Sequence, residues 1–228
     1  MAVDAQATGP KRRHTTGAAT RELLMTTAER LFAVHGVEGV TLREIQLEAG
    51  QSNASVITYH FGSKAGLVRA LITFRYRTVD KRRALSLEQA RADGVSDDPR
   101  AAVWLIVRPL VESIEAGEMF VPFLARLSEN PRTHAEYWPG RIEAATVDAL
   151  ADLTLLAGLP DRVRRGREVQ LYNSVLNLLS EHARSGRRIS EGQLNNYVDG
   201  WVGMLTAPMS PATSELIEAE ARTKHDRE

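Results

Sequence analysis

The chain is 228 residues long, with 43% hydrophobic and 25% charged residues, the composition of an ordinary globular protein. No apolar run approaches the ~18–20 residues of a membrane span, and residues 1–10 contain no apolar segment typical of a secretory signal. The absence of cysteine excludes disulfide frameworks, cysteine-based metal sites and thiolate catalysis. We therefore expect a cytoplasmic protein that does not enter the membrane.

The net charge is zero, but the charges are unevenly distributed along the chain. Lys and Arg outnumber Asp and Glu by 13 to 8 in residues 1–90, whereas Asp and Glu prevail by 21 to 16 in residues 91–228. This asymmetry favours an N-terminal part that meets a polyanion. Two solvated surfaces that differ in charge by chance would give the same counts, so charge alone leaves both interpretations open.

The N-terminal part shows helical periodicity and strong local start and stop signals. The pattern predicts helices at about residues 20–35, 42–49, 52–61 and 63–90. Gly36 and Gly50 end the first and second of these helices. A capping box at residues 41–44 starts the second helix, and Ser52 or Asn53 is expected to cap the third.

The remainder of the chain is also predicted to be helical, so the expected fold class is all-α. After a loop at residues 92–99, Asp98 and Pro99 start a helix, and further helices follow at about 136–157, 161–185 and 191–207. Pro109 and Pro122 are expected to interrupt two helices and to kink them. The polar tail after residue 207 is expected to be loosely ordered.

Two short helices joined by Gly50-Gln51-Ser52, and preceded by a longer one, have the layout of a helix-turn-helix. In that motif the second helix enters the major groove and the first crosses the phosphate backbone. The polar residues expected on the outward face are Gln51, Ser52, Asn53, Ser55 and Thr58, whose side chains pair with base edges or phosphates. Because any all-α protein contains short helix pairs, spacing alone leaves a purely structural pair open.

Several blocks of residues in this region occur in a recognisable order. They are Ala28-Glu29-Arg30-Leu31-Phe32, His35-Gly36, Val40-Thr41-Leu42-Arg43-Glu44-Ile45, Ala49-Gly50 with Ser52, and Tyr59-His60-Phe61-Gly62-Ser63-Lys64 with Leu67. Over about residues 20–75 the sequence resembles the DNA-binding part of the TetR family of transcriptional regulators. The resemblance implies a homodimer that binds a palindromic operator in double-stranded DNA and responds to a small-molecule effector.

The resemblance also implies roles for individual residues. Tyr59 and Lys64 resemble phosphate contacts of the family, and Thr41 resembles the phosphate-binding cap of its second helix. The stretch before Tyr59 is one residue longer than the usual family spacing, so base contacts there stay open. The full set of expected DNA-binding residues is Thr41, Arg43, Gln51, Ser52, Asn53, Ser55, Thr58, Tyr59, His60 and Lys64.

No sequence signature of an enzyme is present. There is no Gly-x-Ser-x-Gly elbow, phosphate loop or dinucleotide fingerprint. The six histidines lack metal-ligand spacing, so His60 is expected to be structural or close to DNA, and we expect no metal and no cofactor. The basic cluster at residues 11–13 is either a solvated tail or an arm that reaches DNA, as homeodomain arms do.

The C-terminal part is expected to bind the effector and to dimerise. Apolar stripes on the last two long helices predict a dimer interface at Tyr172, Val175, Leu176, Leu179, Val198, Trp201 and Leu205, although such stripes would also close the core of one chain. Aromatic residues near the two prolines predict an apolar pocket at Trp104, Val107, Met119, Phe120, Phe123, Tyr137 and Trp138, with core packing as the alternative. Such a pocket favours a lipophilic or aromatic effector.

The expected organisation therefore has four parts. They are a flexible basic arm at 1–18, a three-helix DNA-binding domain at 19–66 with helix 63–90 as connector, a ligand-binding and dimerisation domain at 91–207, and a polar tail at 208–228. The expected function is that of a homodimeric repressor released from its operator by the effector. A ligand-independent regulator or activator of the same fold, and an all-α lipid-binding module, are the alternatives.

Overall fold

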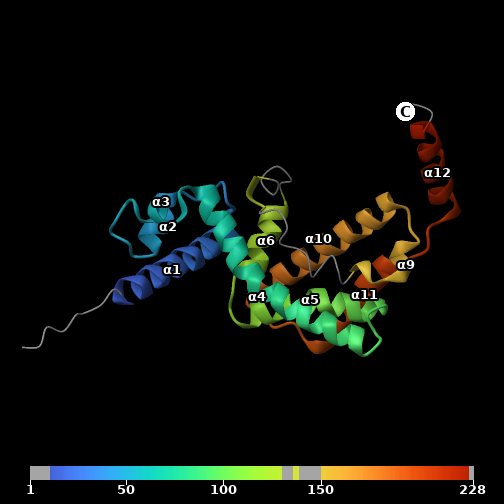
Figure 1. Cartoon of the computed structure of the whole chain (residues 1–228), viewed down its shortest axis with the longest axis horizontal. Helices are drawn as coiled ribbons and strands as arrows, with labels where there is room; N and C mark the ends of the chain where they lie inside the picture. Colours follow the sequence, from blue (N-terminus) through green and yellow to red (C-terminus); the bar gives the residue numbers. More distant parts are fainter. Residues whose placement is uncertain (1–10, 130–135, 139–149, 226–228) are drawn as a thin grey trace, which may run out of the picture.

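A computed structural model describes residues 11–129, 136–138 and 150–225. Figure 1 shows an elongated molecule in which a small group of helices at one end is joined to a larger helical body. The helices are α1 (Lys11–His35), α2 (Leu42–Glu48), α3 (Val56–Phe61), α4 (Lys64–Ala92), α5 (Pro99–Glu115), α6 (Phe120–Ser128), α9 (Thr154–Ala157), α10 (Asp161–Ser185), α11 (Glu191–Thr206) and α12 (Pro211–His225). The described residues contain no strand, and the predicted all-α fold class is confirmed.

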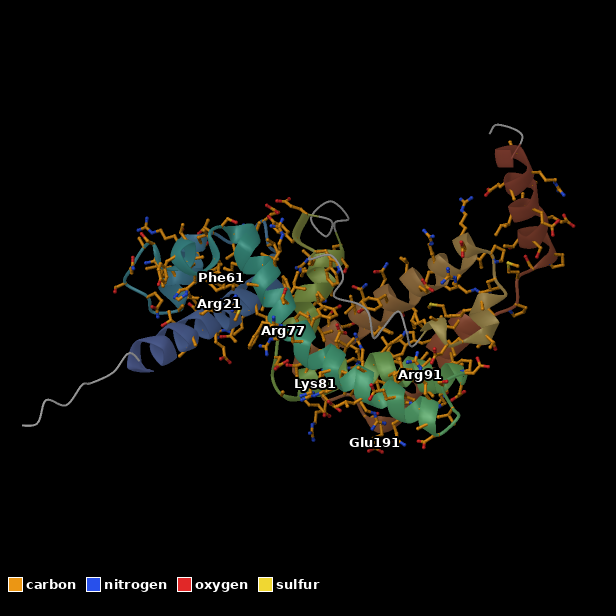
Figure 2. All side chains as sticks on the ribbon, viewed as in Figure 1. Arg21, Phe61, Arg77, Lys81, Arg91 and Glu191 are labelled. Carbon is orange, nitrogen blue, oxygen red and sulfur yellow. The ribbon has the colours of Figure 1, made fainter. Side chains whose placement is uncertain are left out.

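A compact hydrophobic core holds α1, α2, α3 and the start of α4 together. Its fully buried members include Leu24, Ala28 and Phe32 of α1, Ile45 of α2, Ile57 of α3, and Leu67 and Leu71 of α4. The guanidinium of Arg21 also lies 5.0 Å from the ring centroid of Phe61, which stacks the middle of α1 on the end of α3 (Figure 2). The two short helices are therefore fixed from behind.

The junction between α3 and α4 requires glycine at two positions. Gly62 adopts φ +73°, a left-handed conformation that ends α3. Ser63 then caps α4, because its hydroxyl accepts a hydrogen bond from the Gly66 N–H at 3.0 Å. A Cβ added to Gly66 would lie only 1.9 Å from the carbonyl oxygen of Phe61. The sharp turn between the two helices thus depends on a close backbone approach.

Gly66→Ala is expected to destabilise the protein by about 1–3 kcal/mol, because the new methyl group overlaps the Phe61 carbonyl. Gly166→Ala is the matched control, since Gly166 lies inside α10 with no atom within 4 Å of the added Cβ. That control is expected to stabilise the protein by about 0.5–1 kcal/mol, the usual advantage of alanine in a helix. Denaturant unfolding followed by circular dichroism measures both, and equal effects of the two substitutions would contradict the close approach.

The N-terminal boundary of the first helix differs from the prediction. The helix was expected from about Thr20, but α1 begins at Lys11, so residues 11–18 of the expected arm are helical. Among the side chains of α1 that the structure describes, from Gly17 on, the first buried one is Leu24. Residues 11–19 contain no large apolar residue, so the sequence offers no apolar periodicity there from which the extension could be predicted. Residues 1–10 of the expected arm lie outside the described residues.

The larger body is built from α4, α5, α6, α10 and α11. The short apolar helix α6 packs against both α1 and α10, while α11 packs against α5 and α10. As predicted, Asp98 caps α5, accepting hydrogen bonds from the Arg100 and Ala101 N–H groups. The helix α6 thus places the C-terminal body directly against the first helix of the N-terminal group.

The two prolines affect their helices less than expected. Pro109 lies inside α5 without ending it. Pro122 was expected to interrupt a helix, but it is the third residue of α6. The first four N–H groups of a helix have no partner within the helix, so proline is tolerated there. The predicted interruption at Pro122 is therefore wrong.

Two further expectations about the C-terminal part also need correction. The helix expected at 136–157 is not continuous, because Trp138 and Leu153 are not helical; residues 139–149 of it lie outside the described residues. Trp138 precedes a proline, and this position disfavours helical geometry. The tail expected to be loosely ordered contains α12, with Pro211 in its first turn and the hydroxyl of Ser210 accepting a hydrogen bond from the Thr213 N–H at 3.2 Å.

Candidate nucleic-acid interface

The start of α2 is an intact capping box. The Thr41 hydroxyl oxygen accepts a hydrogen bond from the Glu44 N–H at 3.2 Å, and the Thr41 N–H donates to the Glu44 carboxylate at 2.6 Å. These contacts from Thr41 lower the pKa of Glu44, with smaller contributions from the charges of His35 and Lys64. Both Thr41 and Arg43 are exposed here.

The turn between α2 and α3 is organised by backbone and side-chain amides. Gly50 adopts φ +63°, and the Gln51 N–H then donates to the Gln46 carbonyl at 3.0 Å. The Gln51 side chain folds back to donate to the Ala49 carbonyl at 3.2 Å. Gln51 is therefore a half-buried turn residue, which corrects the expectation that it lies on the outward face of the third helix.

The third helix begins later than expected. Asn53 does not cap α3; its side-chain oxygen instead accepts a hydrogen bond from the Ser55 N–H at 2.9 Å, an Asx-turn before the helix. The residue that occupies the cap position is Ser55, without a capping side-chain hydrogen bond. Ser52, Asn53 and Ser55 are all exposed, but they belong to the turn. The extra residue of this sequence is thus accommodated before α3.

The helix α3 presents an unusual surface. Val56 and Ile57 are buried and anchor it, whereas Thr58 and Tyr59 face outward. Tyr59 is 84% exposed, its ring contacting only the neighbouring His60 at 5.1 Å between centroids. An aromatic residue this exposed contributes little to the core and is available to a partner. Lys64 stands half-buried at the first position of α4.

The expected DNA-binding residues thus gather at one end of the molecule. They lie on α2, the turn, α3 and the first residue of α4, at the end remote from α12 (Figure 1). The free N–H groups at the starts of α2 and α4, with Lys64, favour phosphate oxygens. The exposed amide and hydroxyl side chains of the turn and α3 suit base edges. Chemically, the surface fits a polyanionic double helix.

A buried ionic cluster, missed by the sequence analysis, joins this end to the body. Arg75 of α4 donates to both carboxylate oxygens of Glu29 on α1, at 2.5 and 3.0 Å, and to Glu118 at 2.6 Å. The Met119 N–H donates to Glu29 at 2.9 Å, and the Ser113 hydroxyl donates to Glu118 at 2.6 Å. Burial raises the pKa of Glu29, although Arg75 opposes that shift. The sequence did contain a signal for this cluster: Glu29 lies four residues from both Met25 and Ala33, and thus on the apolar face of α1.

Four of the expected pocket residues belong to an aromatic cluster or its surroundings. Tyr76 of α4 meets Phe120 and Trp138 edge-on at 5.5 and 5.4 Å between centroids, and its hydroxyl lies 3.0 Å from that of Tyr172. Phe123 extends the cluster, 6.3 Å from Phe120. The cluster thus connects α4, α6 and α10, and Met119 packs partly buried against the same core.

The remaining three expected pocket residues lie in different places. Val107 is fully buried in the core. Trp104 lines an open groove of about 510 Å³ between α4 and α5, and none of the other six residues reaches that groove. Tyr137 donates a hydrogen bond to Glu38 at 3.2 Å, and burial together with Glu38 raises its pKa to about 12. Tyr137 is therefore a neutral phenol that ties the body to the loop after α1.

The expected dimer residues are mostly core residues of a single chain. Val175, Leu176, Leu179, Val198, Trp201 and Leu205 are each no more than 2% exposed. Tyr172 is half-buried beside Tyr76, and the Trp201 ring N–H donates to Ser174 at 2.9 Å. The six fully buried side chains have almost no surface left to offer a partner, so the structure places them in the core of one chain and not at the expected dimer interface. Amphipathic periodicity reports which face of a helix is buried, and here α10 and α11 bury that face against their own chain.

In the ranges that the structure describes, no group of three or more histidine, aspartate or glutamate residues is arranged to hold a metal ion. Among the same residues, no helix is both long enough and apolar enough to cross a membrane.

The fold and the surface of α2 and α3 define a helix-turn-helix protein, and its N-terminal part is similar to a known family. The profile of the family described as bacterial regulatory proteins, tetR family, matches residues 24–71. The HTH-type transcriptional repressor AcnR of Corynebacterium glutamicum is 34% identical over 92 residues, which cover 39% of this chain and 47% of AcnR. The matched region thus spans about half the length of that curated relative. Over residues 24–71 the chain is thus similar to the TetR family.

Two solved structures show the same fold at low sequence identity. A protein from Shewanella sp. PV-4, described as a TetR-family transcription regulator, superposes with a TM-score of 0.57 at 15% identity and covers 80% of this chain and 95% of its own. A second one from Mesorhizobium loti MAFF303099 gives 0.51 at 18% identity, covering 84% of this chain and 96% of its own. The helical arrangement therefore extends well beyond the matched N-terminal region.

Proposed function

We propose that this chain is a non-enzymatic, DNA-binding transcriptional regulator that acts as a homodimeric repressor. The observation that carries the proposal is the exposed face of α3, where Thr58 and Tyr59 project from a helix anchored by buried residues. Lys64 and the Thr41 cap stand beside it, as phosphate contacts require. The similarity to a protein named as a repressor supports the direction of control.

The proposed dimer uses the outward faces of α10 and α11. On α10, Val169 is 58% exposed, and Asn173 and Asn177 follow it on the surface. On α11, Gly192, Gly200 and Gly203 have no atom within 4 Å of a built Cβ, so a second helix can approach closely. Two subunits are needed because two recognition helices about 34–36 Å apart enter successive major grooves of a palindromic operator.

The proposed effector is a small lipophilic or aromatic molecule that binds beside the cluster of Tyr76, Phe120 and Trp138. This cluster touches α4, which continues from the recognition helix through the Gly62–Gly66 junction. A ligand that prefers a shifted α4 lowers the affinity for operator, and operator lowers the affinity for that ligand equally. The Tyr76–Tyr172 hydroxyl pair supplies a polar group at the same place.

Selection of bound sites from randomised duplex DNA tests the proposed function. We expect the wild type to enrich a two-fold symmetric sequence, and Asn53→Ala to change the preferred bases while retaining most of the affinity. The reason is that Asn53 is exposed in the turn, where its amide reaches base edges rather than the core. Ser96→Ala, in the loop before α5, is the control for a small polar change elsewhere. Recovery of no common sequence by the wild type would contradict the proposal.

A further inference from the structure

Two helical segments bury no described side chain in their own chain, although Arg167 of α10 donates hydrogen bonds to the backbone carbonyls of Leu205 and Ala207. The first ten residues of α10, residues 161–170, contain no buried side chain, and the first buried residue of that helix is Leu171. None of the described side chains of α12 is buried either. Figure 1 shows α12 standing beyond the N-terminal end of α10, away from the helical body. We call residues 161–170 and α12 together the overhang.

Within one chain, few interactions hold α12 in place. Arg162 pairs with Glu220, but their side chains are 77% and 58% exposed, and such pairs contribute about 0–1 kcal/mol. Leu216 is 66% exposed, and neither it nor Ile217 belongs to the hydrophobic core. A helix of 15 residues is marginal in water without packing of its apolar side. Helix α12 would therefore be more stable if another surface packed against its exposed apolar residues.

The charges of the two parts of the overhang are complementary. Residues 161–170 contain Arg162, Arg164, Arg165 and Arg167 against Asp161 and Glu168. Residues 211–221 contain Glu215, Glu218 and Glu220 and no lysine or arginine. Within one chain, the ion pair between α12 and α10 lies at Arg162, near the start of α10. Val169 lies seven residues further on, about 10 Å along the helix, and remains 58% exposed.

We propose that α12 of each subunit docks on residues 161–170 of a second copy of this chain. In a two-fold symmetric pair the contact occurs twice, with the acidic first part of α12 (residues 211–221) of one subunit on the arginine-rich segment of the other. Leu216 and Ile217 cover Val169, and Glu215 and Glu218 face Arg162 and Arg165. This exchange rests on the proposed homodimer and adds a second contact beside the outward faces of α10 and α11.

Single-cysteine cross-linking tests the exchange, because the chain has no cysteine of its own. Val169→Cys and Leu216→Cys are placed in separate full-length chains with different tags, which are then co-expressed and mildly oxidised. Because each tagged chain carries only one of the two cysteines, a disulfide between Val169→Cys and Leu216→Cys must join two subunits. We expect its yield to exceed, by about tenfold, that of the control pair Leu85→Cys with Leu216→Cys, because docking raises the effective concentration. Leu85 is similarly exposed, at 59%, but lies on α4.

Charge reversal supplies the second readout. Glu215→Lys with Glu218→Lys is expected to abolish the excess cross-linking, and pairing it with Arg162→Glu and Arg165→Glu in the other chain is expected to restore it. A dimer that binds DNA but gives no Val169–Leu216 cross-link above the control overturns the exchange and leaves the proposed function standing. A protein that sediments as a monomer at micromolar concentration and binds no operator overturns both.

Discussion

Replacing Arg75 with methionine is expected to lower the free energy of unfolding by about 3–5 kcal/mol. The substitution removes the cation and leaves Glu29, 2% exposed, facing Glu118 without a counter-charge. The isolated exposed pair Arg82–Glu112 offers a matched control, since its side chains are 52% and 44% exposed. Arg82→Met is expected to cost less than about 1 kcal/mol. Urea unfolding of both variants measures the difference, and equal losses would show that the buried cluster carries no special weight.

The loss caused by Arg75→Met is expected to depend on pH. Burial already raises the pKa of Glu29, and removing Arg75 takes away the largest opposing contribution, so that pKa rises further. A glutamate with a raised pKa in the folded state favours folding when protonated, and that contribution is lost as the pH rises through the folded-state pKa. The deficit of the variant therefore shrinks as the pH falls from about 8 to about 5. In the double variant Glu29→Gln, Arg75→Met this dependence is expected to weaken.

The same cluster connects the two ends of the molecule. Glu29 belongs to α1, Arg75 to α4, and Glu118 with the Met119 N–H to the connection between α5 and α6. If α4 shifts on effector binding, either the whole cluster moves with α4 or its ion pairs break. Under the proposed function, Arg75→Met therefore lowers the stability of the fold and also weakens the coupling between effector binding and operator binding.

Tyr59→Ala is expected to weaken operator binding by at least about tenfold while leaving stability nearly unchanged. The side chain is 84% exposed, so the folded protein loses little contact, whereas the complex loses a contact at the centre of the interface. Lys64→Ala is expected to weaken binding on all sequences alike and to reduce the salt slope by about one. Leu85→Ala, an exposed apolar change on α4, is the control and is expected to bind as the wild type does. Unchanged affinity of Tyr59→Ala would contradict the assignment of this face.

The N-terminal architecture was predictable because its signals are local. The capping box at Thr41 and Glu44 and the stop at Gly50 each depend on neighbouring residues, and each occurs as predicted. The start of α3 was misplaced because Asn53 satisfies the Ser55 N–H in a turn, and a turn and a cap use the same residue types. Sequence alone does not distinguish these two uses of an asparagine.

The C-terminal part was less predictable because its interactions are long-range. The stripe containing Leu176 and Trp201 indicated burial correctly but not the surface that buries it. The pairing of Glu29 with Arg75 joins residues 46 positions apart, and no local pattern specifies such a partner. Helix α12 was missed because its sequence is polar and charged, and without core contacts such a sequence resembles that of a loosely ordered tail.

Binding of this surface to a specific DNA site can be measured in a single titration. The purified full-length protein is titrated with duplex DNA flanking its own gene and with unrelated duplex DNA, each at two salt concentrations. We expect tight binding to one flanking site, at least about a thousandfold tighter than to unrelated DNA, with affinity that falls steeply as salt rises. Equal, weak binding to every duplex, or affinity that is independent of salt, would contradict it.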